Sequence, residues 1–213
     1  MALNFCGIDC GFTGGISIIL GNDLDNPIVY KMPVIKEVKK VKGKNKTKQF
    51  YDLLEIRKIF KNHLSKNSII FVEKVSNMPG EGSSSTFSFA KGFGNMEGLI
   101  VGTFGNLPVL ITPQSWKKYF PELITNEMRG IKAEMKELRL AGKKIKGKEA
   151  KKENKKHIDK LGRQFKSLAK TEARMLVSKL YPSISDRFVK KNTDGMAESL
   201  LIALYGKNKG QSK

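Results

Sequence analysis

Leu3-Asn-Phe-Cys-Gly-Ile-Asp9, followed by Cys10-Gly-Phe-Thr-Gly-Gly-Ile-Ser-Ile-Ile-Leu20, is the stretch of sequence on which the predicted fold depends. An apolar run ends at Asp9, a glycine-rich turn follows, and a second β-branched run returns, which predicts two antiparallel strands. The first strand therefore delivers a carboxylate at the point where its regular backbone stops. An Asp at a turn also accepts hydrogen bonds from the turn's own amides, so Asp9 taken alone leaves a purely structural role open.

The composition predicts one domain with a real core and no membrane partner. The chain has 213 residues, of which 39% are hydrophobic, enough for a single sizeable core. No apolar run approaches the roughly 20 residues of a membrane span and no signal peptide opens the sequence, so we expect a cytoplasmic protein. Cys6 and Cys10 lie ~13 Å apart if they share one strand, too far for a disulfide. Two such thiols indicate a reducing compartment and no zinc site.

Charge is the dominant feature of the composition. The chain has 40 Lys and Arg against 20 Asp and Glu, a net charge of +20, which indicates a polyanionic partner, most often nucleic acid. Residues 129–170 carry sixteen Lys and Arg against five Asp and Glu and few large apolar side chains. We therefore expect one domain over residues 1–213, with an exposed, partly helical, lysine-rich insert at about 125–163.

The periodicity of the remaining sequence predicts an α/β fold. It contains one five-stranded mixed sheet, an antiparallel meander followed by parallel strands, with helices on both faces. The expected segments after the first hairpin are a strand at 28–34, a solvated, mobile loop at 36–48, a helix from Thr47, a buried strand at 68–73, a polar, flexible loop at 76–85, a helix at 86–104, a strand at 107–111, a helix starting at Thr112-Pro113, a helix at 164–181 and a final helix at 193–205.

Three further acids fall at the ends of predicted elements. Glu73 ends a buried strand as Asp9 does, and because neighbouring strands lie ~4.8 Å apart, the two acids could share one metal ion. Asp194 and Glu198 are four residues apart and share one face of the final helix. Acids also favour the first turn of a helix through capping and the helix dipole, which is the ordinary alternative for this pair.

Three motifs carry a resemblance to a known family: Gly7-Ile-Asp9-x-Gly11, Phe71-Val-Glu73 and Asp194-x-x-Ala197-Glu198-x-Leu200. On them the chain resembles the RuvC family of Holliday junction resolvases, within the ribonuclease H-like superfamily. As a small, basic chain with long inserts it also looks like the phage-encoded branch of that family. Thr112-Pro113-x-x-Trp116-Lys117 and Lys166-x-x-Ala169-Lys170 are similar to later segments of that family. The resemblance implies a ribonuclease H-like fold, a homodimer, and an endonuclease that nicks Holliday junctions and other branched DNA.

Two departures from the family pattern concern the site itself. The family's closing helix usually offers two aspartates three apart, whereas this chain has Asp194 and Glu198 four apart. An aromatic residue that often follows the strand-four Glu by three positions is replaced by Ser76. A wedge that opens the centre of a junction would then come from another residue, with Met78, Phe87 and Phe89 as possibilities.

The acids suit phosphodiester hydrolysis by two metal ions, which activate a water and stabilise the leaving oxygen. Carboxylate oxygens favour Mg²⁺, with Mn²⁺ as a substitute. We expect Asp9 to bridge two ions, Glu73 and Asp194 to complete their shells, and Glu198 to bind one directly or through water. The resemblance assigns Lys170 to the scissile phosphate, although a lysine there is also an ordinary surface charge. With His63 and His157 as the chain's two histidines, His-based catalysis is not expected.

The predicted partner is branched DNA, and eight lysines are assigned to it: Lys74, Lys91, Lys117, Lys118, Lys143, Lys144, Lys166 and Lys170. A solvated arm or a surface for a protein partner remain alternatives for the insert. A non-catalytic branched-DNA-binding protein would explain the charge but not the acids at the element ends. Asp9-x-Gly11-x-Thr13 also resembles the phosphate loop of actin-like sugar kinases, but those need a second such loop, which the sequence lacks.

Overall fold

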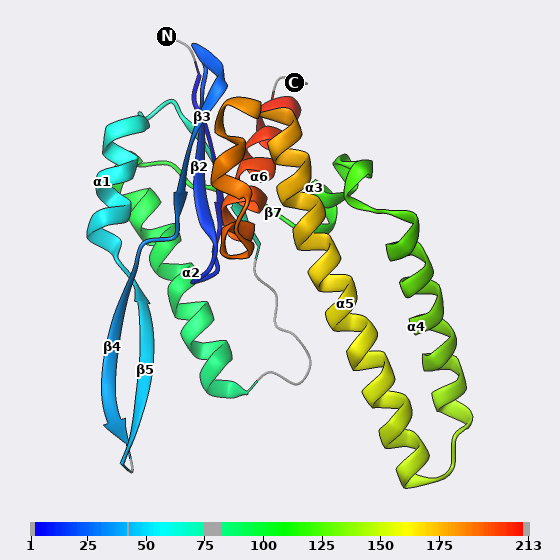
Figure 1. Ribbon diagram of the computed structural model, residues 1–213. Coiled ribbons are helices and arrows are strands. Elements are labelled where there is room, and N and C mark those ends of the chain that lie inside the picture. Colours follow the sequence, from blue (N-terminus) through cyan, green and yellow to red (C-terminus); the bar gives the residue numbers. More distant parts are fainter. Residues whose placement is uncertain (1–2, 42, 75–81, 211–213) are drawn as a thin grey trace.

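The structure, a computed structural model, describes residues 3–41, 43–74 and 82–210. Five strands form one mixed sheet in the order β3-β2-β1-β6-β7 (Figure 1), in which β1, β2 and β3 are an antiparallel meander and β6 and β7 run parallel to β1. The strands are β1 (Phe5–Asp9), β2 (Gly15–Leu20), β3 (Asp23–Lys31), β6 (Ile69–Glu73) and β7 (Val109–Ile111). The predicted five-stranded mixed sheet and its strand directions are confirmed.

Helices cover both faces of this sheet, and each face has its own core (Figure 1). One face packs against α1 (Leu53–His63) and α2 (Ser83–Phe104) through buried side chains such as Ile8, Phe60 and Met96. The other packs against α6 (Asp194–Gly210), α3 (Pro113–Tyr119) and the C-terminal half of α5 (Lys148–Leu180). Three short 3₁₀ turns complete this side: η1 (Pro121–Leu123), η2 (Pro182–Phe188) and η3 (Lys191–Thr193).

Helix α6 lies directly on the first hairpin, and glycines make this approach possible. A Cβ at Gly7 would lie 2.2 Å from the Ser199 carbonyl oxygen, and a Cβ at Gly195 would lie 2.3 Å from the Gly14 Cα. The buried hydroxyls of Ser17 and Ser199 lie 2.7 Å apart and join β2 to the helix. The first turns of α6 are therefore held beside the end of β1, where Asp9 lies.

The prediction of a loop at 36–48 was wrong. Strands β4 (Val34–Val41) and β5 (Lys44–Tyr51) form a separate two-stranded antiparallel hairpin, the hairpin arm, which projects from the sheet (Figure 1). The chain reverses at Gly43, whose φ of +75° is readily adopted only by glycine. The strand predicted at 28–34 consequently ends at Lys31, and the helix predicted from Thr47 begins at Leu53, where Asp52 caps it.

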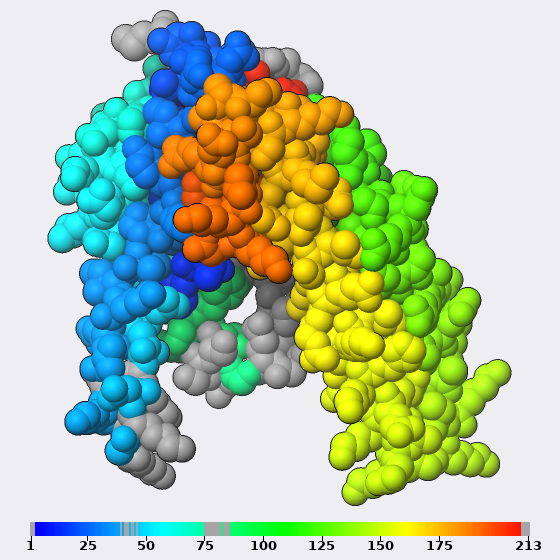
Figure 2. Space-filling model, viewed as in Figure 1, coloured from blue at the N-terminus to red at the C-terminus, as the bar shows by residue number. Residues whose placement is uncertain are grey.

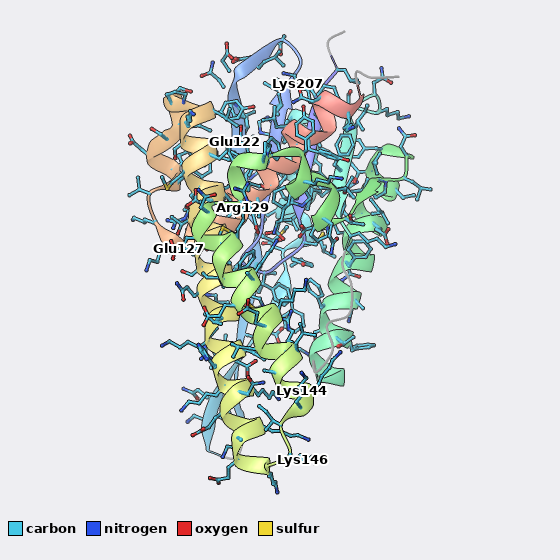
Figure 3. The ribbon with its side chains drawn as sticks, turned by 90° about the vertical axis from the view of Figure 1, so that its right-hand side faces the viewer. Glu122, Glu127, Arg129, Lys144, Lys146 and Lys207 are labelled. Carbon is cyan, nitrogen blue, oxygen red and sulfur yellow. The ribbon has the colours of Figure 1, made fainter. Side chains whose placement is uncertain are left out.

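The lysine-rich insert is an antiparallel pair of helices, the helical arm, formed by α4 (Asn126–Lys144) and α5 (Figures 1 and 3). Its predicted exposure is confirmed, but it is almost wholly helical. Helix α5 also runs unbroken through the boundary that the sequence predicted at Gln164. The two helices are joined by hydrogen bonds from Gln164 to Glu127 (3.2 Å) and from Asn154 to the Leu138 carbonyl (3.1 Å). The arm is therefore held together by its own contacts.

The loop predicted at 76–85 falls largely outside the described residues, which exclude 75–81 and with them Ser76 and Met78. Helix α2 begins at Ser83, three residues before the predicted start. The helix predicted at Thr112-Pro113 is confirmed as α3, with the Thr112 hydroxyl accepting from the Ser115 amide at 3.2 Å. Both cysteines are buried and free. Among the described helices, none has the length and apolar character needed to cross a membrane.

Candidate active site

Three carboxylates approach one another at a single edge of the sheet. Asp9 ends β1 and Glu73 ends β6, and because these strands are parallel neighbours their carboxyl ends meet at the same edge. Glu198 comes from the second turn of α6, which Gly7 allows to lie against β1. The charges of Glu198 and Glu73 both raise the pKa of Asp9, which shows that the three groups interact electrostatically.

Asp9 has the most perturbed carboxyl of this group. Loss of hydration on burial, followed by the charges of Glu198 and Glu73, raises the pKa of Asp9 to about 7. A hydrogen bond from the Gly11 amide at 3.2 Å and the charge of Lys117 act in the opposite direction. Asp9 thus does accept a bond from its own turn, as the structural alternative expected. The same side chain also faces two other acids, which turn chemistry alone does not require.

Glu73 and Glu198 each contact a side chain of α3: Trp116 contacts Glu73, and Lys117 contacts Glu198. The indole N–H of Trp116 donates to Glu73 Oε1 at 2.8 Å, and Lys117 Nζ lies 3.2 Å from Glu198 Oε1. Burial raises the pKa of Glu73, the bond from Trp116 lowers it, and the charges of Glu198 and Lys117 then act in opposite directions. Lys117 also lies 4.8 Å from the centre of the Trp116 ring. Two neighbouring side chains therefore orient two acids from different elements.

Asp194, the fourth predicted acid, is held from the side of α5. Its carboxylate lies 2.9 Å from Arg174 Nε and 3.3 Å from Lys170 Nζ. The Asp194 and Arg174 side chains are only 16% and 12% exposed, so this ion pair is well shielded from water. The charges that raise the pKa of Asp9 belong instead to Glu198 and Glu73. The sequence predicted Asp194 as a direct ligand and left Glu198 as a direct or water-mediated one. In the structure it is Glu198 whose charge raises the pKa of Asp9.

The predicted DNA-contacting lysines are spread over several parts of the molecule. Lys117 and Lys170 are each paired with an acid of the site. Lys143 and Lys144 lie at the distal end of α4, as Lys144 shows in Figure 3. The remaining four are Lys74 after β6, Lys91 on α2, Lys118 on α3 and Lys166 on α5, and all four are exposed. Within the described residues, none of these six forms an ion pair with an acid of the site.

Neither histidine takes part in the acid cluster. His63 Nε2 lies 2.8 Å from the Tyr30 hydroxyl at the end of α1, and His157 Nε2 lies 3.3 Å from Glu134 on the helical arm. Catalysis without histidine stays a prediction.

Three residues of the site were not assigned a role from the sequence. Arg174 pairs with Asp194, and its position four residues after Lys170 places both on one helix face, a signal that was available. Trp116 was quoted as part of a motif but given no role, and its bond to Glu73 needs the tertiary structure. The third residue is Glu97. Burial raises the pKa of the Cys10 thiol, and the charge of Glu97 adds to that effect together with the charges of Asp9 and Glu73. Glu97 of α2 is thus a further acid near the end of β1.

The donor set at this edge fits a divalent cation. Within the described residues, no group of three Asp, Glu, His or Cys side chains is already arranged as a metal site. Burial first, and then the charge of neighbouring acids, nevertheless raises the pKa of Asp9 and of Glu73, and a cation among Asp9, Glu73 and Glu198 would stabilise their ionised forms. Oxygen donors of this kind suit Mg²⁺. Asp194 would have to exchange its partners Arg174 and Lys170 for the ion to join them.

Comparison with protein-family models finds none that matches this chain, and comparison with curated proteins finds no significant match either. The functional interpretation therefore depends on the residues and geometry described above.

Proposed function

We propose that this chain is a metal-dependent DNA endonuclease of the RuvC type, which nicks Holliday junctions and other branched DNA. The observation that supports this most strongly is the gathering of Asp9, Glu73 and Glu198 at one sheet edge in a chain of net charge +20. Carboxylates repel the phosphates that the rest of the protein attracts. A bound cation removes that conflict, so the combination favours cleavage over DNA binding alone.

In the proposed mechanism each acid has a separate task. Two Mg²⁺ ions, when bound, would supply a nucleophilic water and stabilise the leaving 3′ oxygen. Asp9 interacts with both other acids, so Asp9, Glu73 and Glu198 would hold the ions, with Asp194 as a fourth acid. Trp116 fixes one Glu73 oxygen. Lys170 pairs with Asp194, and once released it would contact the scissile phosphate, the role that the resemblance implies.

A non-catalytic branched-DNA-binding protein is the second candidate. Lys117 pairs with Glu198, and Lys170 and Arg174 pair with Asp194, so two of the four acids are already partly neutralised by the protein itself. Such pairs could serve only to hold α3, α5 and α6 together. A phosphotransferase of the actin-like kind is the less favoured alternative, since it needs a second phosphate loop.

We also propose that the nuclease is a homodimer, because a two-fold pair supplies two equivalent sites for two symmetric nicks. A Cβ at Gly92 would lie 2.5 Å from the Tyr51 ring, so this glycine serves packing within the chain. At Gly94, Gly98 and Gly102, spaced along α2, an added Cβ meets nothing within 4 Å. That part of α2 is available for a second copy or for DNA. A sedimentation mass of one chain, unchanged by junction DNA, would contradict the dimer.

The function is tested by incubating the protein with labelled four-way, three-way, flapped and linear DNA in Mg²⁺, in Mn²⁺ and in EDTA. We expect nicks on branched DNA in either metal, much slower nicking of linear duplex and none in EDTA. The Asp9→Asn variant is the control for a contaminating nuclease. Binding of branched DNA without metal-dependent nicking of any substrate would favour the non-catalytic alternative.

A further inference from the structure

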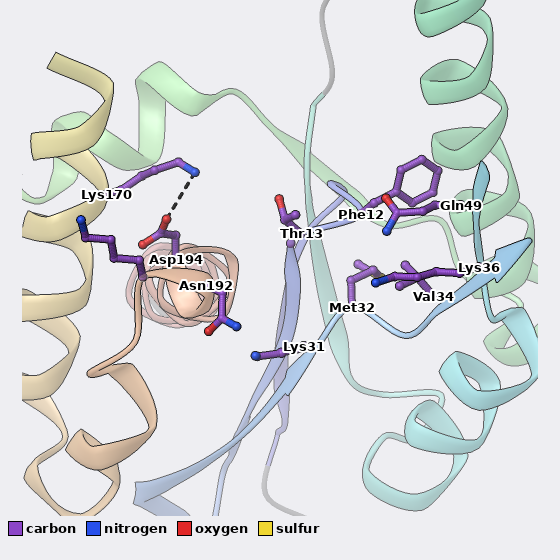
Figure 4. A pocket seen from close by; sticks show the side chains of 12 residues that line it. Phe12, Thr13, Lys31, Met32, Val34, Lys36, Gln49, Lys170, Asn192 and Asp194 are labelled. Carbon is purple, nitrogen blue, oxygen red and sulfur yellow. Dashed lines mark ion pairs between the residues drawn. The ribbon is translucent and has the colours of Figure 1, made fainter. Parts of the chain in front are cut away.

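A cavity of about 380 Å³ lies between the root of the hairpin arm and α5 (Figure 4). Four lysines line it from different elements. Lys31 at the end of β3 and Lys36 on β4 form one side, while Lys170 on α5 and Lys191 in η3 belong to the other. The β1–β2 turn contributes Thr13 between them (Figure 4). Its volume lies within the range of about 300–1,000 Å³ that is usual for ligand pockets.

The positive charge of this cavity is only partly compensated. Lys170 pairs with Asp194 at 3.3 Å, and Asp194 is also shared with Arg174. In the part of the chain that the structure describes, Lys31, Lys36 and Lys191 form no ion pair. Like charges that face one hollow destabilise each other, and an anion bound among them removes that cost.

The polar groups of the cavity suit a phosphate in particular. Gln49 is the cross-strand partner of Lys36 on β5, so both side chains point to the same face of the hairpin arm and into the cavity. Thr13 and Asn192 add a hydroxyl and an amide (Figure 4). Lysines together with Thr, Asn and Gln side chains are the groups that commonly contact DNA phosphates.

The position of the cavity relates it to the acid cluster and to both arms. Asp194 lines it and is one helical turn from Glu198. Its two walls belong to the roots of the hairpin arm and the helical arm, and the molecule is hollowed between these arms (Figure 2). A backbone held here would therefore pass beside the acids rather than over them.

We propose that this cavity binds a phosphate of the DNA backbone other than the one that is cleaved, so that the hairpin arm and α5 together clamp the strand next to the active site. The inference rests on the proposed function only in taking DNA as the ligand. Free nucleotide phosphates share the same chemistry, and Thr13 belongs to the turn that resembles a kinase phosphate loop. The experiments distinguish these two sources of phosphate.

Affinity is measured by fluorescence anisotropy with four-way and duplex DNA in EDTA, at several salt concentrations. The test variant is Lys31/Lys36/Lys191→Ala, and the control is Lys61/Lys66/Lys179→Ala, which removes three other exposed lysines that lie outside the cavity. We expect the test variant to bind at least about tenfold more weakly than the control, with a log–log salt slope smaller by about 0.9 for each duplex phosphate that is no longer neutralised. Equal affinities and equal slopes for the two variants would overturn the clamp.

Lysine acylation of the unmodified protein gives a second readout that does not depend on how a variant folds. In EDTA, junction DNA should protect Lys31, Lys36 and Lys191 but not Lys61, Lys66 and Lys179. Protection of the first three by a millimolar nucleoside triphosphate, without protection by DNA, would overturn the assignment to the backbone. Because neither assay uses cleavage, a failure of the nuclease proposal and a failure of the clamp give different results.

Discussion

The centre of the molecule and its two arms are held in place in different ways. At the centre, α6 lies so close to β1 that Gly7 leaves no room for a Cβ, and Phe60, Trp116 and Leu200 are fully buried. In the hairpin arm and the helical arm most side chains are exposed (Figure 2). Strand β4 pairs with β5, and α4 packs on the N-terminal half of α5. The acids belong to the packed centre, whereas most of the excess lysines belong to the arms.

Catalysis and DNA binding place different requirements on the centre and on the arms. Metal-assisted catalysis needs ligands that are held to within fractions of an ångström, and a packed sheet edge supplies that precision. Phosphate binding by lysine tolerates movement because the attraction is long-ranged and non-directional. Substitutions at the centre should therefore change cleavage or folding, and substitutions in the arms should change affinity and its salt dependence.

The largest expected effect is the loss of cleavage in Asp9→Asn. Partners that only orient a metal ligand typically change activity 10–100-fold, so removal of a ligand itself should lower the nicking rate by more than about 100-fold. Junction affinity should be unchanged or slightly higher, because one negative charge near the DNA is removed. Single-turnover nicking and anisotropy on the same preparation measure both. A rate within a few-fold of the parent would exclude Asp9 as a ligand.

Gly7→Ala tests how closely the centre is packed. The added Cβ would lie 2.2 Å from the Ser199 carbonyl oxygen, which belongs to backbone and cannot rotate away. Overpacking usually costs about 1–3 kcal/mol, and we expect at least about 2 kcal/mol here from urea unfolding. The matched control is Gly130→Ala on α4, where a Cβ meets nothing within 4 Å and stability should rise by up to about 1 kcal/mol. Similar changes at both positions would contradict the comparison.

Trp116→Phe tests how the site is oriented while keeping an aromatic ring in place. The variant removes the donor 2.8 Å from Glu73 and should lower the nicking rate about 10–100-fold. Because the bond from Trp116 lowers the pKa of Glu73, its removal raises that pKa. The acidic limb of the pH–rate profile should therefore move to higher pH. A reduced rate with an unmoved profile would indicate only a packing role for Trp116.

The raised pKa of Asp9 predicts a pH-dependent stability when no divalent ion is present. The carboxyl has a pKa of 3.8 in its reference state and of about 7 in the folded chain, so between these values the folded state retains a proton that the unfolded state has lost. The free energy of unfolding then falls as the pH rises toward 7. Above pH 7 the cost of ionising the buried Asp9 carboxyl is present in full. The Asp9→Asn variant has no ionisable carboxyl at this position, so it lacks this cost.

Denaturant unfolding in EDTA at pH 5 and pH 8 measures this difference. Since one pKa unit corresponds to about 1.4 kcal/mol, the stability gained by Asp9→Asn over the parent should be more than about 1 kcal/mol larger at pH 8 than at pH 5. A constant difference between the two proteins at both pH values would show that Asp9 ionises normally.

The smallest expected effect is in the helical arm. If the distal end of the helical arm binds phosphates, Lys143/Lys144/Lys146/Lys148→Ala should weaken binding to every DNA structure by a similar factor, because phosphate binding carries little sequence information. The salt slope should fall by about 0.9 for each phosphate on duplex arms that the tip no longer neutralises, and discrimination between branched and linear DNA should survive. An unchanged slope would mean that the tip is a solvated arm or binds a protein partner.

The sequence predicted the centre better than the arms, for a physical reason. Strands β1 and β6 are apolar runs that end in an acid, and α6 is an apolar helix that is buried on nearly all sides, so the apolar runs locate Asp9, Glu73 and Glu198. The approach of Asp9 to Glu73 then follows from parallel pairing, whereas Glu198 approaches through the close packing of α6 on β1. The pairing of Asp194 with Arg174, and of Glu73 with Trp116, depends on tertiary contacts that periodicity does not report.

The hairpin arm was missed because a strand without a buried face has little periodic signal. Its exposed residues include Ile35 and Val38, and its lysines were taken as the mark of a loop. Signals for strands were nonetheless present in the β-branched residues of 34–47 and in Gly43 at the reversal. Helix α5 was divided at Gln164 for a similar reason, since apolar residues become sparse where it leaves the core and packs only on α4.

We propose that Asp9, Glu73 and Glu198 together bind the catalytic ions, and locating bound metal is the decisive test of this claim. Crystals of the protein grown or soaked with Mn²⁺ would be measured at a wavelength where manganese scatters anomalously. We predict anomalous density at about 2.0–2.3 Å from carboxylate oxygens of all three acids, and its disappearance in Asp9→Asn. Manganese bound at Asp194 alone, or density at none of the three acids when the ion is saturating, would contradict the claim.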